Sequence, residues 1–170
     1  MQVFEAVKTL LAIRQYEDQA ISEESVQRIL EAARLTASSK NTQQWDFVVV
    51  QNKETLQRLG ELARTGPYIA GAPLAIAVVV PERSIGYVDG ARAVQDMMLV
   101  AWEEGIGSNW VGNVNTDEIK SLLNVPGNHM VLTIVPFGYP VRDVGEGKKQ
   151  RKPLSEIAHA ERFGQPYAGR

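Results

Sequence analysis

Residues 36–50 read Thr-Ala-Ser-Ser-Lys-Asn-Thr-Gln-Gln-Trp-Asp-Phe-Val-Val-Val, so a polar stretch leads directly into an apolar, β-branched one. Before it, apolar residues recur at helical spacing from Val26 to Ala33, and Ser22 is a suitable N-cap for that helix. After it, residues 45–50 have the composition of a strand. This part of the chain is therefore predicted to form a helix, a polar loop and a strand in succession.

The other apolar patterns alternate between helical and strand types. Residues 74–80 form a continuous apolar run that is typical of a buried strand. Residues 87–104 predict a long helix that is apolar most of the way round, so most of its surface must be covered. Further helices are expected at 2–11, 52–62, 116–123 and 154–160, and further strands at 108–111 and 130–137. Because helices and strands are intermixed, the fold is predicted to be an α+β or α/β sandwich.

Length and composition exclude several classes of protein. A chain of 170 residues fits a single domain, expected to span 1–170. Lysine and arginine number 18 against 20 acidic residues, which argues against a nucleic-acid partner. No apolar run reaches the roughly 18 residues that a membrane span needs, and the N-terminal residues lack the plan of a signal peptide. We therefore expect a cytoplasmic protein with no membrane partner.

The chain has no cysteine and only two histidines. Disulfides, thiolate metal sites and a cysteine nucleophile are thereby excluded, and so is a histidine-rich metal site. No metal site is expected.

The polar stretch is the segment with the most chemistry. Hydroxyls and carboxamides both donate and accept hydrogen bonds, which suits a ligand that carries carbonyls, ring nitrogens and sugar hydroxyls. A loop whose Ser and Asn side chains satisfy its own turns is the alternative interpretation. Composition alone leaves both open.

Three motifs follow one another along the chain. In the first, Ser38, Asn41, Gln43 and Trp45 precede a strand, with Ala37 and Gln44 at positions where a similar motif has proline. The second is Gly-Ile-Gly-Ser-Asn-Trp-Val-Gly at 105–112, and the third is Gly-Tyr-Pro at 138–140 followed by Lys-Gln-Arg at 149–151. In this order, from about residue 4 to 158, they resemble the nitroreductase family of flavoproteins.

The resemblance implies both a fold and an activity. The fold would be a three-layer α+β sandwich with a mainly antiparallel central sheet flanked by helices, in an intertwined homodimer with two FMN sites built from both chains. The activity would be hydride transfer from NADH or NADPH through FMN to a small-molecule acceptor such as a nitroaromatic or a quinone. Hydride transfer is chemistry of the flavin, so no catalytic side chain is expected.

The resemblance also implies roles for particular residues. Lys149 and Arg151 would hold the FMN phosphate, for which an ammonium and a guanidinium fork are suited. A solvated basic tail is the alternative for this cluster. The other implied cofactor contacts are Arg14 to the phosphate or ribityl chain, Asn41 and Gln43 to the ribityl chain and ring edge, Ser38 and Ser39 from the partner subunit, and backbone N–H groups at Val111, Gly112 and Asn113 near the reactive flavin nitrogen.

Two positions depart from the family pattern. Leu11 and Ala12 stand where the family has an Arg and a Ser that touch the flavin, and each lost bond is worth roughly 1 kcal/mol. Lys40 or Lys148 could supply substitutes. The chain is also short for the family, so an open site is expected.

Two alternatives to the nitroreductase-like activity therefore stay open. One is an FMN protein with a different redox task, and the other is a dimeric binding protein that has lost flavin.

Overall fold

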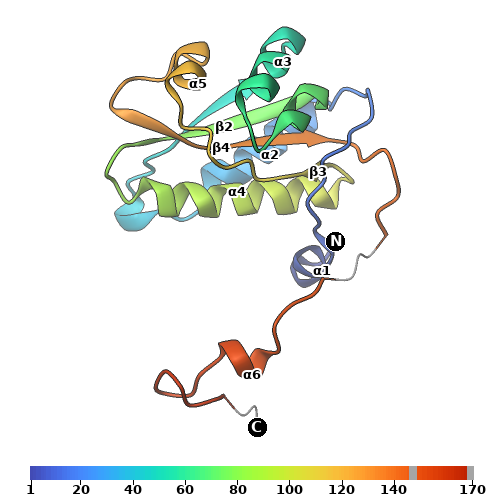
Figure 1. Cartoon of the computed structure of the whole chain (residues 1–170). Helices are drawn as coiled ribbons and strands as arrows, with labels where there is room; N and C mark the ends of the chain where they lie inside the picture. Colours follow the sequence, from blue (N-terminus) through green and yellow to red (C-terminus); the bar gives the residue numbers. More distant parts are fainter. Residues whose placement is uncertain (146–148, 168–170) are drawn as a thin grey trace.

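A computed structural model describes residues 1–145 and 149–167 of the chain. Its sheet has the strand order β1-β2-β4-β3, and each neighbouring pair is antiparallel (Figure 1). The strands of this sheet are β1 (Asp46–Val50), β2 (Leu74–Pro81), β3 (Gly107–Ser108) and β4 (His129–Gly138). The antiparallel sheet expected from the resemblance is thus confirmed.

The helices begin where polar side chains cap them. Ser22, Asn52 and Thr116 each accept a hydrogen bond from the backbone N–H three residues further on, as the sequence pattern predicts. The helices are α1 (Val3–Thr9), α2 (Glu23–Leu35), α3 (Lys53–Leu62), α4 (Gly86–Glu103), α5 (Asp117–Leu122) and α6 (Leu154–Ile157), with 3₁₀ turns η1 (Ser39–Asn41) and η2 (Pro67–Gly71).

The helices cover both faces of the sheet, so the molecule has three layers (Figure 1). The continuous apolar run of β2 arises because its successive side chains point to opposite faces of the sheet, and both faces are buried. Leu74, Ile76 and Val78 are buried in a core with α2 and α4, whereas Ala75 and Ala77 are buried in a second core with α3 and α5. The predicted buried strand is therefore buried because helices lie on both of its faces.

Helix α4 packs closely on the sheet at Gly90. A Cβ atom at this position would lie only 2.9 Å from Leu132 Cδ2, so glycine permits the close approach. Met97 is fully buried, but Leu99 and Val100 remain half-buried. The expectation that α4 is covered on most faces is thus met only in part by a single chain.

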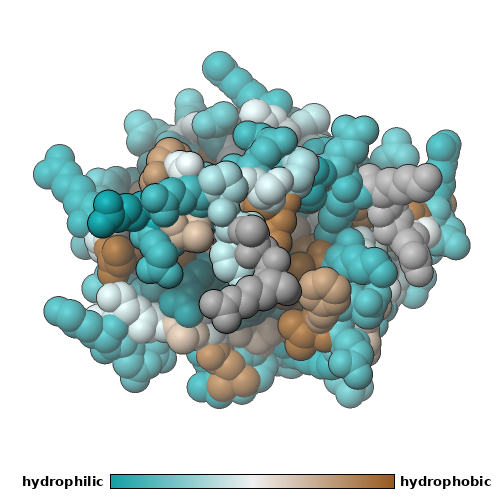
Figure 2. All heavy atoms as spheres, turned by 90° about the horizontal axis from the view of Figure 1, so that it is seen from below, coloured by the Kyte–Doolittle hydropathy of each residue, from teal (hydrophilic) through white to brown (hydrophobic). Residues whose placement is uncertain are grey.

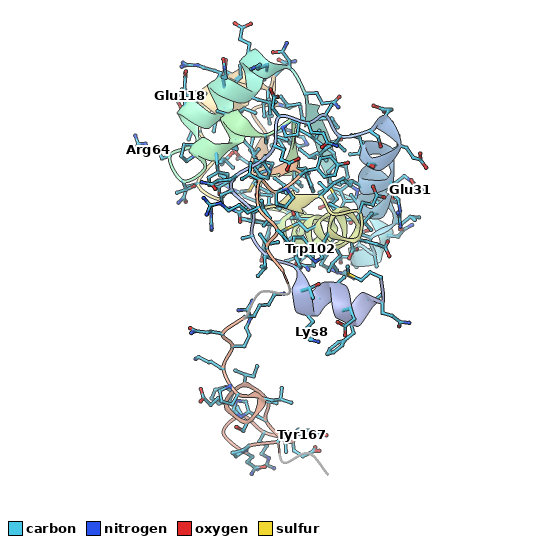
Figure 3. The ribbon with its side chains drawn as sticks, turned by 90° about the vertical axis from the view of Figure 1, so that its right-hand side faces the viewer. Lys8, Glu31, Arg64, Trp102, Glu118 and Tyr167 are labelled. Atoms are coloured by element: carbon cyan, nitrogen blue, oxygen red, sulfur yellow. The ribbon has the colours of Figure 1, made fainter. Side chains whose placement is uncertain are left out.

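Two segments lie away from these cores. Helix α1 exposes 77% of Val3 and 75% of Phe4. The segment 149–167, called the arm, carries α6 and projects from the body, with Tyr167 far from the sheet (Figures 1 and 3). Leu154 is 66% exposed and Phe163 is 94% exposed. Apolar side chains also reach the surface in Figure 2, which views the molecule from below Figure 1.

Some element boundaries differ from the predicted ones. The first helix ends at Thr9 rather than at residue 11, because the chain becomes extended and Ala12 forms a bridge to Ser108. The strand expected at 108–111 is reduced to Gly107–Ser108, and Val111 forms an isolated bridge to Ile134. Among the described residues, no helix has the length and apolarity needed to cross a membrane.

Candidate functional site

A pocket of about 560 Å³ lies between α1, α4 and the start of the arm, and we call it the basic pocket. This volume is within the range of small-molecule sites. Three cationic side chains lie on a largely apolar lining. The lining residues are Phe4, Val7, Lys8, Leu10, Leu11, Ala12, Gln95, Met98, Lys149 and Arg151.

Lys149 and Arg151, far from α1 in sequence, meet it at this pocket. The Lys149 ammonium donates a hydrogen bond of 2.6 Å to the Val7 carbonyl in the last turn of α1. Arg151 is exposed and donates to the carbonyl of neighbouring Gln150, at 2.8 Å. Burial, and then the positive charge of Arg151, lower the pKa of Lys149 from its ordinary value. The pair therefore presents two cations in a place where an anion would relieve their repulsion.

The apolar part of the basic pocket is formed where the sequence departs from the family pattern. Leu10, Leu11 and Ala12 lie in the extended segment after α1, where the Ile13 N–H donates to the Ser108 carbonyl at 2.9 Å. Leu11 and Ala12 thus give the pocket apolar surface, and their side chains can form no hydrogen bond with a ligand. Lys8, labelled on α1 in Figure 3, is a third cation that sequence reasoning missed.

Arg14 follows the extended segment that lines the basic pocket, and its guanidinium lies over an aromatic ring. Its guanidinium carbon lies 5.8 Å from the centroid of the Tyr68 ring, within the range of a cation–π contact. The buried Asn109 amide donates to the Tyr68 hydroxyl. Asn109 therefore helps to fix the Tyr68 ring on which Arg14 lies. The sequence spacing of these three residues did not predict the contact.

The backbone after β3 has only part of the donor capacity expected of it. The Val111 N–H donates to the Ile134 carbonyl at 3.1 Å, so it has no free hydrogen for a ligand. The Gly112 carbonyl accepts from the Thr65 hydroxyl at 2.7 Å, which fixes its peptide plane. Within the described residues the N–H groups of Gly112 and Asn113 donate to no protein acceptor, so these two N–H groups are available to a ligand.

The residues of the first motif lie elsewhere. Ser38, Ser39, Asn41 and Gln43 belong to residues 36–45, called the polar loop, which runs along α4 from Asp96, where Thr36 is bound, to Gly86. The Ser39 N–H is bound to Asp89, whereas the lining residues Gln95 and Met98 lie about 9 and 13 Å further along the helix axis. Of the chain's described residues, none between 38 and 43 lines the basic pocket.

The predicted site residues thus form three groups in one chain. The backbone at 111–113 is a group apart, because none of these residues lines the basic pocket and Asn113 lines a different pocket with Arg64 and Thr65. Lys149 and Arg151 share the basic pocket, with Arg14 two residues beyond its lining residue Ala12. The polar loop forms the second group, with Lys40 exposed on it. Lys148 lies outside the described residues. No cluster of three or more potential metal ligands occurs in the part of the chain that the structure describes.

Comparison with known proteins places the chain in a family. The nitroreductase family model matches residues 11–86 and 69–139. A protein of Methanothermobacter thermautotrophicus, provisionally named an NADH dehydrogenase/NAD(P)H nitroreductase, is 32% identical over 155 residues, covering 85% of this chain and 81% of that protein. An FMN reductase (NAD(P)H) of Bacillus subtilis is 27% identical, covering 94% of this chain and 74% of that one.

A solved structure agrees with the sequence matches. The FMN-dependent nitroreductase of Clostridium difficile superposes with a TM-score of 0.83 at 29% identity, covering 94% of this chain and 99% of that one. The family model, the relatives and the shared fold agree over most of the chain, and the chain belongs to the nitroreductase family.

Proposed function

We propose that this chain is an FMN-dependent oxidoreductase that passes electrons from NADH or NADPH to a small-molecule acceptor such as a nitroaromatic or a quinone. The observation that carries the proposal is the basic pocket, where Lys149 and Arg151 stand beside the apolar side chains of Leu10, Leu11 and Met98. A phosphate and an aromatic ring system in one ligand match this combination. The family and the names of the relatives support the same cofactor.

The cations, the apolar side chains and the free backbone N–H groups have the chemistry that FMN requires. Lys149 and Arg151 would bind the phosphate, because charge-assisted bonds are stronger than neutral ones. The apolar segment from Leu10 to Ala12 would exclude water from one side of the ligand. The N–H groups of Gly112 and Asn113 would donate to the flavin edge, where they stabilise negative charge in the reduced form. When bound, FMN supplies the hydride acceptor and donor, so the chain needs no catalytic side chain.

The proposal includes a homodimer in which each site is shared. The polar loop carries Asn41 and Gln43 but stands apart from the basic pocket of its own chain. A loop from a second copy would complete the pocket. The exposed apolar residues of α1 and of the arm would be covered in the same assembly, since solvent exposure of several large apolar side chains in one region marks an interface.

Visible absorption spectroscopy tests the cofactor. The purified protein is mixed with FMN, dialysed and scanned, then titrated anaerobically with NADH or NADPH. We expect a retained flavin spectrum that bleaches with the nicotinamide and returns when a quinone is added. Retained flavin without bleaching would contradict the nicotinamide reaction and leave a different redox task. Loss of all flavin on dialysis would favour a binding protein without flavin, in line with the apolar Leu11 and Ala12.

Subunit complementation tests the shared site. One variant, Lys149→Ala with Arg151→Ala, has a defective basic pocket, and another, Asn41→Ala with Gln43→Ala, has a defective polar loop. In a mixed dimer both defects fall in one site and the other site is intact, so random mixing should restore about a quarter of the wild-type FMN sites. If each site is built from one chain, mixing restores none.

A further inference from the structure

The polar loop is tied to α4 by two carboxylates that the proposed function does not use. The Thr36 hydroxyl donates to Asp96 at 2.6 Å, a shorter contact than its 3.1 Å approach to the Ala32 carbonyl. The Ser39 backbone N–H donates to Asp89 at 2.9 Å. Both acceptors are side chains of one helix, and both donors lie near the start of the loop.

The distance between the two donors on the loop matches the distance between the two acceptors on α4. Asp89 and Asp96 are seven residues apart, so they lie on one face of α4 about 10.5 Å apart along its axis. Thr36 and Ser39 are three residues apart, which spans roughly 10 Å when the chain is extended. Thr36 has ψ 137°, and Ser38 has φ −121° and ψ 158°, so this stretch is extended and has little slack.

A third contact continues the same alignment. A Cβ atom at Gly86 would lie 2.7 Å from the Gln44 carbonyl oxygen, so the end of the loop rests directly on the first residue of α4. Along the loop the helix partners come in the order Asp96, Asp89 and Gly86. The loop therefore runs antiparallel to α4 and is fixed at both ends and near the middle.

Between Ser39, which is bound to Asp89, and Gln44, which rests on Gly86, the backbone adopts strained conformations. Lys40, Asn41 and Gln43 have φ angles of 50°, 56° and 50°, in the left-handed region that costs a non-glycine residue roughly 1 kcal/mol or more. The Gln43 N–H donates to the Ser38 hydroxyl at 3.0 Å, which closes the loop. Such a conformation persists only when the surrounding structure holds it.

The burial of Asp89 shows that its tie is not a surface contact. Its exposed fraction is 2%, and a buried carboxylate is costly without partners. It lies in the first turn of α4, where the helix dipole favours negative charge, and its other oxygen is 3.9 Å from the Arg92 guanidinium. The Ser39 N–H is its hydrogen-bond donor, so the carboxylate and the loop depend on each other.

We propose that Asp89 and Asp96 are positioning residues of the flavin site, which hold the polar loop so that Asn41 and Gln43 reach the flavin bound in the basic pocket of the partner subunit. This inference rests on the proposed function. The carboxylates touch no ligand, and they act only by fixing the position and conformation of the loop.

Binding measurements with two ligands test the proposal. FMN and riboflavin differ by the phosphate, which in the proposed arrangement is bound by Lys149 and Arg151 and not by the polar loop. Asp89→Ala should therefore weaken both ligands by the same factor, about tenfold or more, and Asp96→Ala should do so by several fold. The ratio of the two dissociation constants should stay at its wild-type value. Asp89→Asn should restore most of the affinity, because its carbonyl still accepts from Ser39.

A matched control removes a different carboxylate of α4. Glu103 pairs with Arg28 of α2 at 2.6 Å and with the N-terminal ammonium of Met1 at 2.7 Å, and it has no contact with the polar loop. Glu103→Ala should leave both dissociation constants within twofold of wild type. Because Asp89→Ala places a cavity near the core, a milder variant at the other contact is also needed. Thr36→Val removes only the hydroxyl that donates to Asp96. Combined with Asp96→Ala it should cost no more than either change alone.

A second readout needs no flavin. In the flavin-free protein, amide hydrogen exchange over residues 36–45 should accelerate in Asp89→Ala and in Thr36→Val but not in Glu103→Ala. Unchanged exchange and unchanged affinity in the loop variants would overturn the proposal. If the wild-type protein binds neither FMN nor riboflavin, the proposed function fails, while the exchange comparison still decides whether the carboxylates hold the loop.

Discussion

Replacing both Lys149 and Arg151 by alanine should abolish the preference of this protein for FMN over riboflavin. Charge-assisted hydrogen bonds contribute about 1.5–3 kcal/mol each, and the lower end applies in an open pocket. One of the three Lys149 ammonium hydrogens is already donated to the Val7 carbonyl, at 2.6 Å, so two remain for a phosphate. The pair is therefore worth about 3 kcal/mol, or roughly 150-fold in the FMN dissociation constant.

The assay is a flavin fluorescence titration of each variant with FMN and with riboflavin. The double variant should lose FMN affinity while its riboflavin affinity stays within twofold of wild type. Lys152→Ala is the matched control, because Lys152 is an exposed neighbouring cation that does not line the basic pocket. An unchanged FMN-to-riboflavin ratio in the double variant would refute the phosphate assignment. An equal loss in Lys152→Ala would indicate a general effect of a solvated basic tail.

The pH dependence of FMN binding gives a second readout of the same pair. Phosphate binding requires the protonated Lys149 ammonium, and burial, together with the Arg151 charge, lowers the pKa of Lys149. FMN affinity should therefore begin to fall, as pH rises, below the ordinary lysine pKa of about 10.4. Arg151→Ala removes the second cause and should move this alkaline limb to higher pH. Riboflavin has every ionisable group of FMN except the phosphate, so it is the control. An alkaline limb of the same size and position in riboflavin binding would exclude the contact between Lys149 and the phosphate as the cause.

Three other expectations concern stability and assembly. Burial raises the pKa of Tyr16, so its protonated form is favoured in the folded state; stability should decline as pH rises above its unfolded value of about 10, and Tyr16→Phe should lessen that decline in urea unfolding. Gly107→Ala places a Cβ atom against the Ile13 side chain and should cost about 1–3 kcal/mol in thermal unfolding, whereas Gly71→Ala, which meets open space, should cost little. Leu154→Ser with Ile157→Ser should weaken the proposed dimer roughly a hundredfold or more in sedimentation, because each replacement would remove buried apolar surface from both copies of the arm. An unchanged dimer would remove the arm from the interface.

The fold was largely predictable because its signals are local. Ser22, Asn52 and Thr116 cap helices within three residues of themselves, and the pattern of residues 74–80 needs only helices on two faces. The end of α1 was not predictable from such signals. Leu10 and Leu11 continue its apolar pattern, but pairing of Ala12 with Ser108, almost a hundred residues away, draws the chain into an extended conformation. A tertiary contact thus overrides local helical preference.

The resemblance named candidate site residues, but it gave no information about their arrangement. Resemblance named Lys149 and Arg151, and the structure places both at one pocket, yet nothing in their spacing indicates that they face α1. The same resemblance named Val111, whose N–H is used by Ile134 across a bridge that sequence patterns do not reveal. Which amide is free depends on strand pairing between distant residues, and local patterns carry no information about it.

One pattern in the sequence could have indicated the hydrogen bonds between the polar loop and α4. Helix α4 has an apolar interior face along most of its length, and acidic residues are rarely buried in such a helix unless they are paired. Asp89 and Asp96 stand two turns apart on it, so an extended segment alongside the helix can meet both. A buried carboxylate at the first turn also benefits from the helix dipole, which makes Asp89 less costly there than at any later turn. In this chain the segment held along α4 by the two acids is the polar loop, on which the proposed shared flavin site would depend.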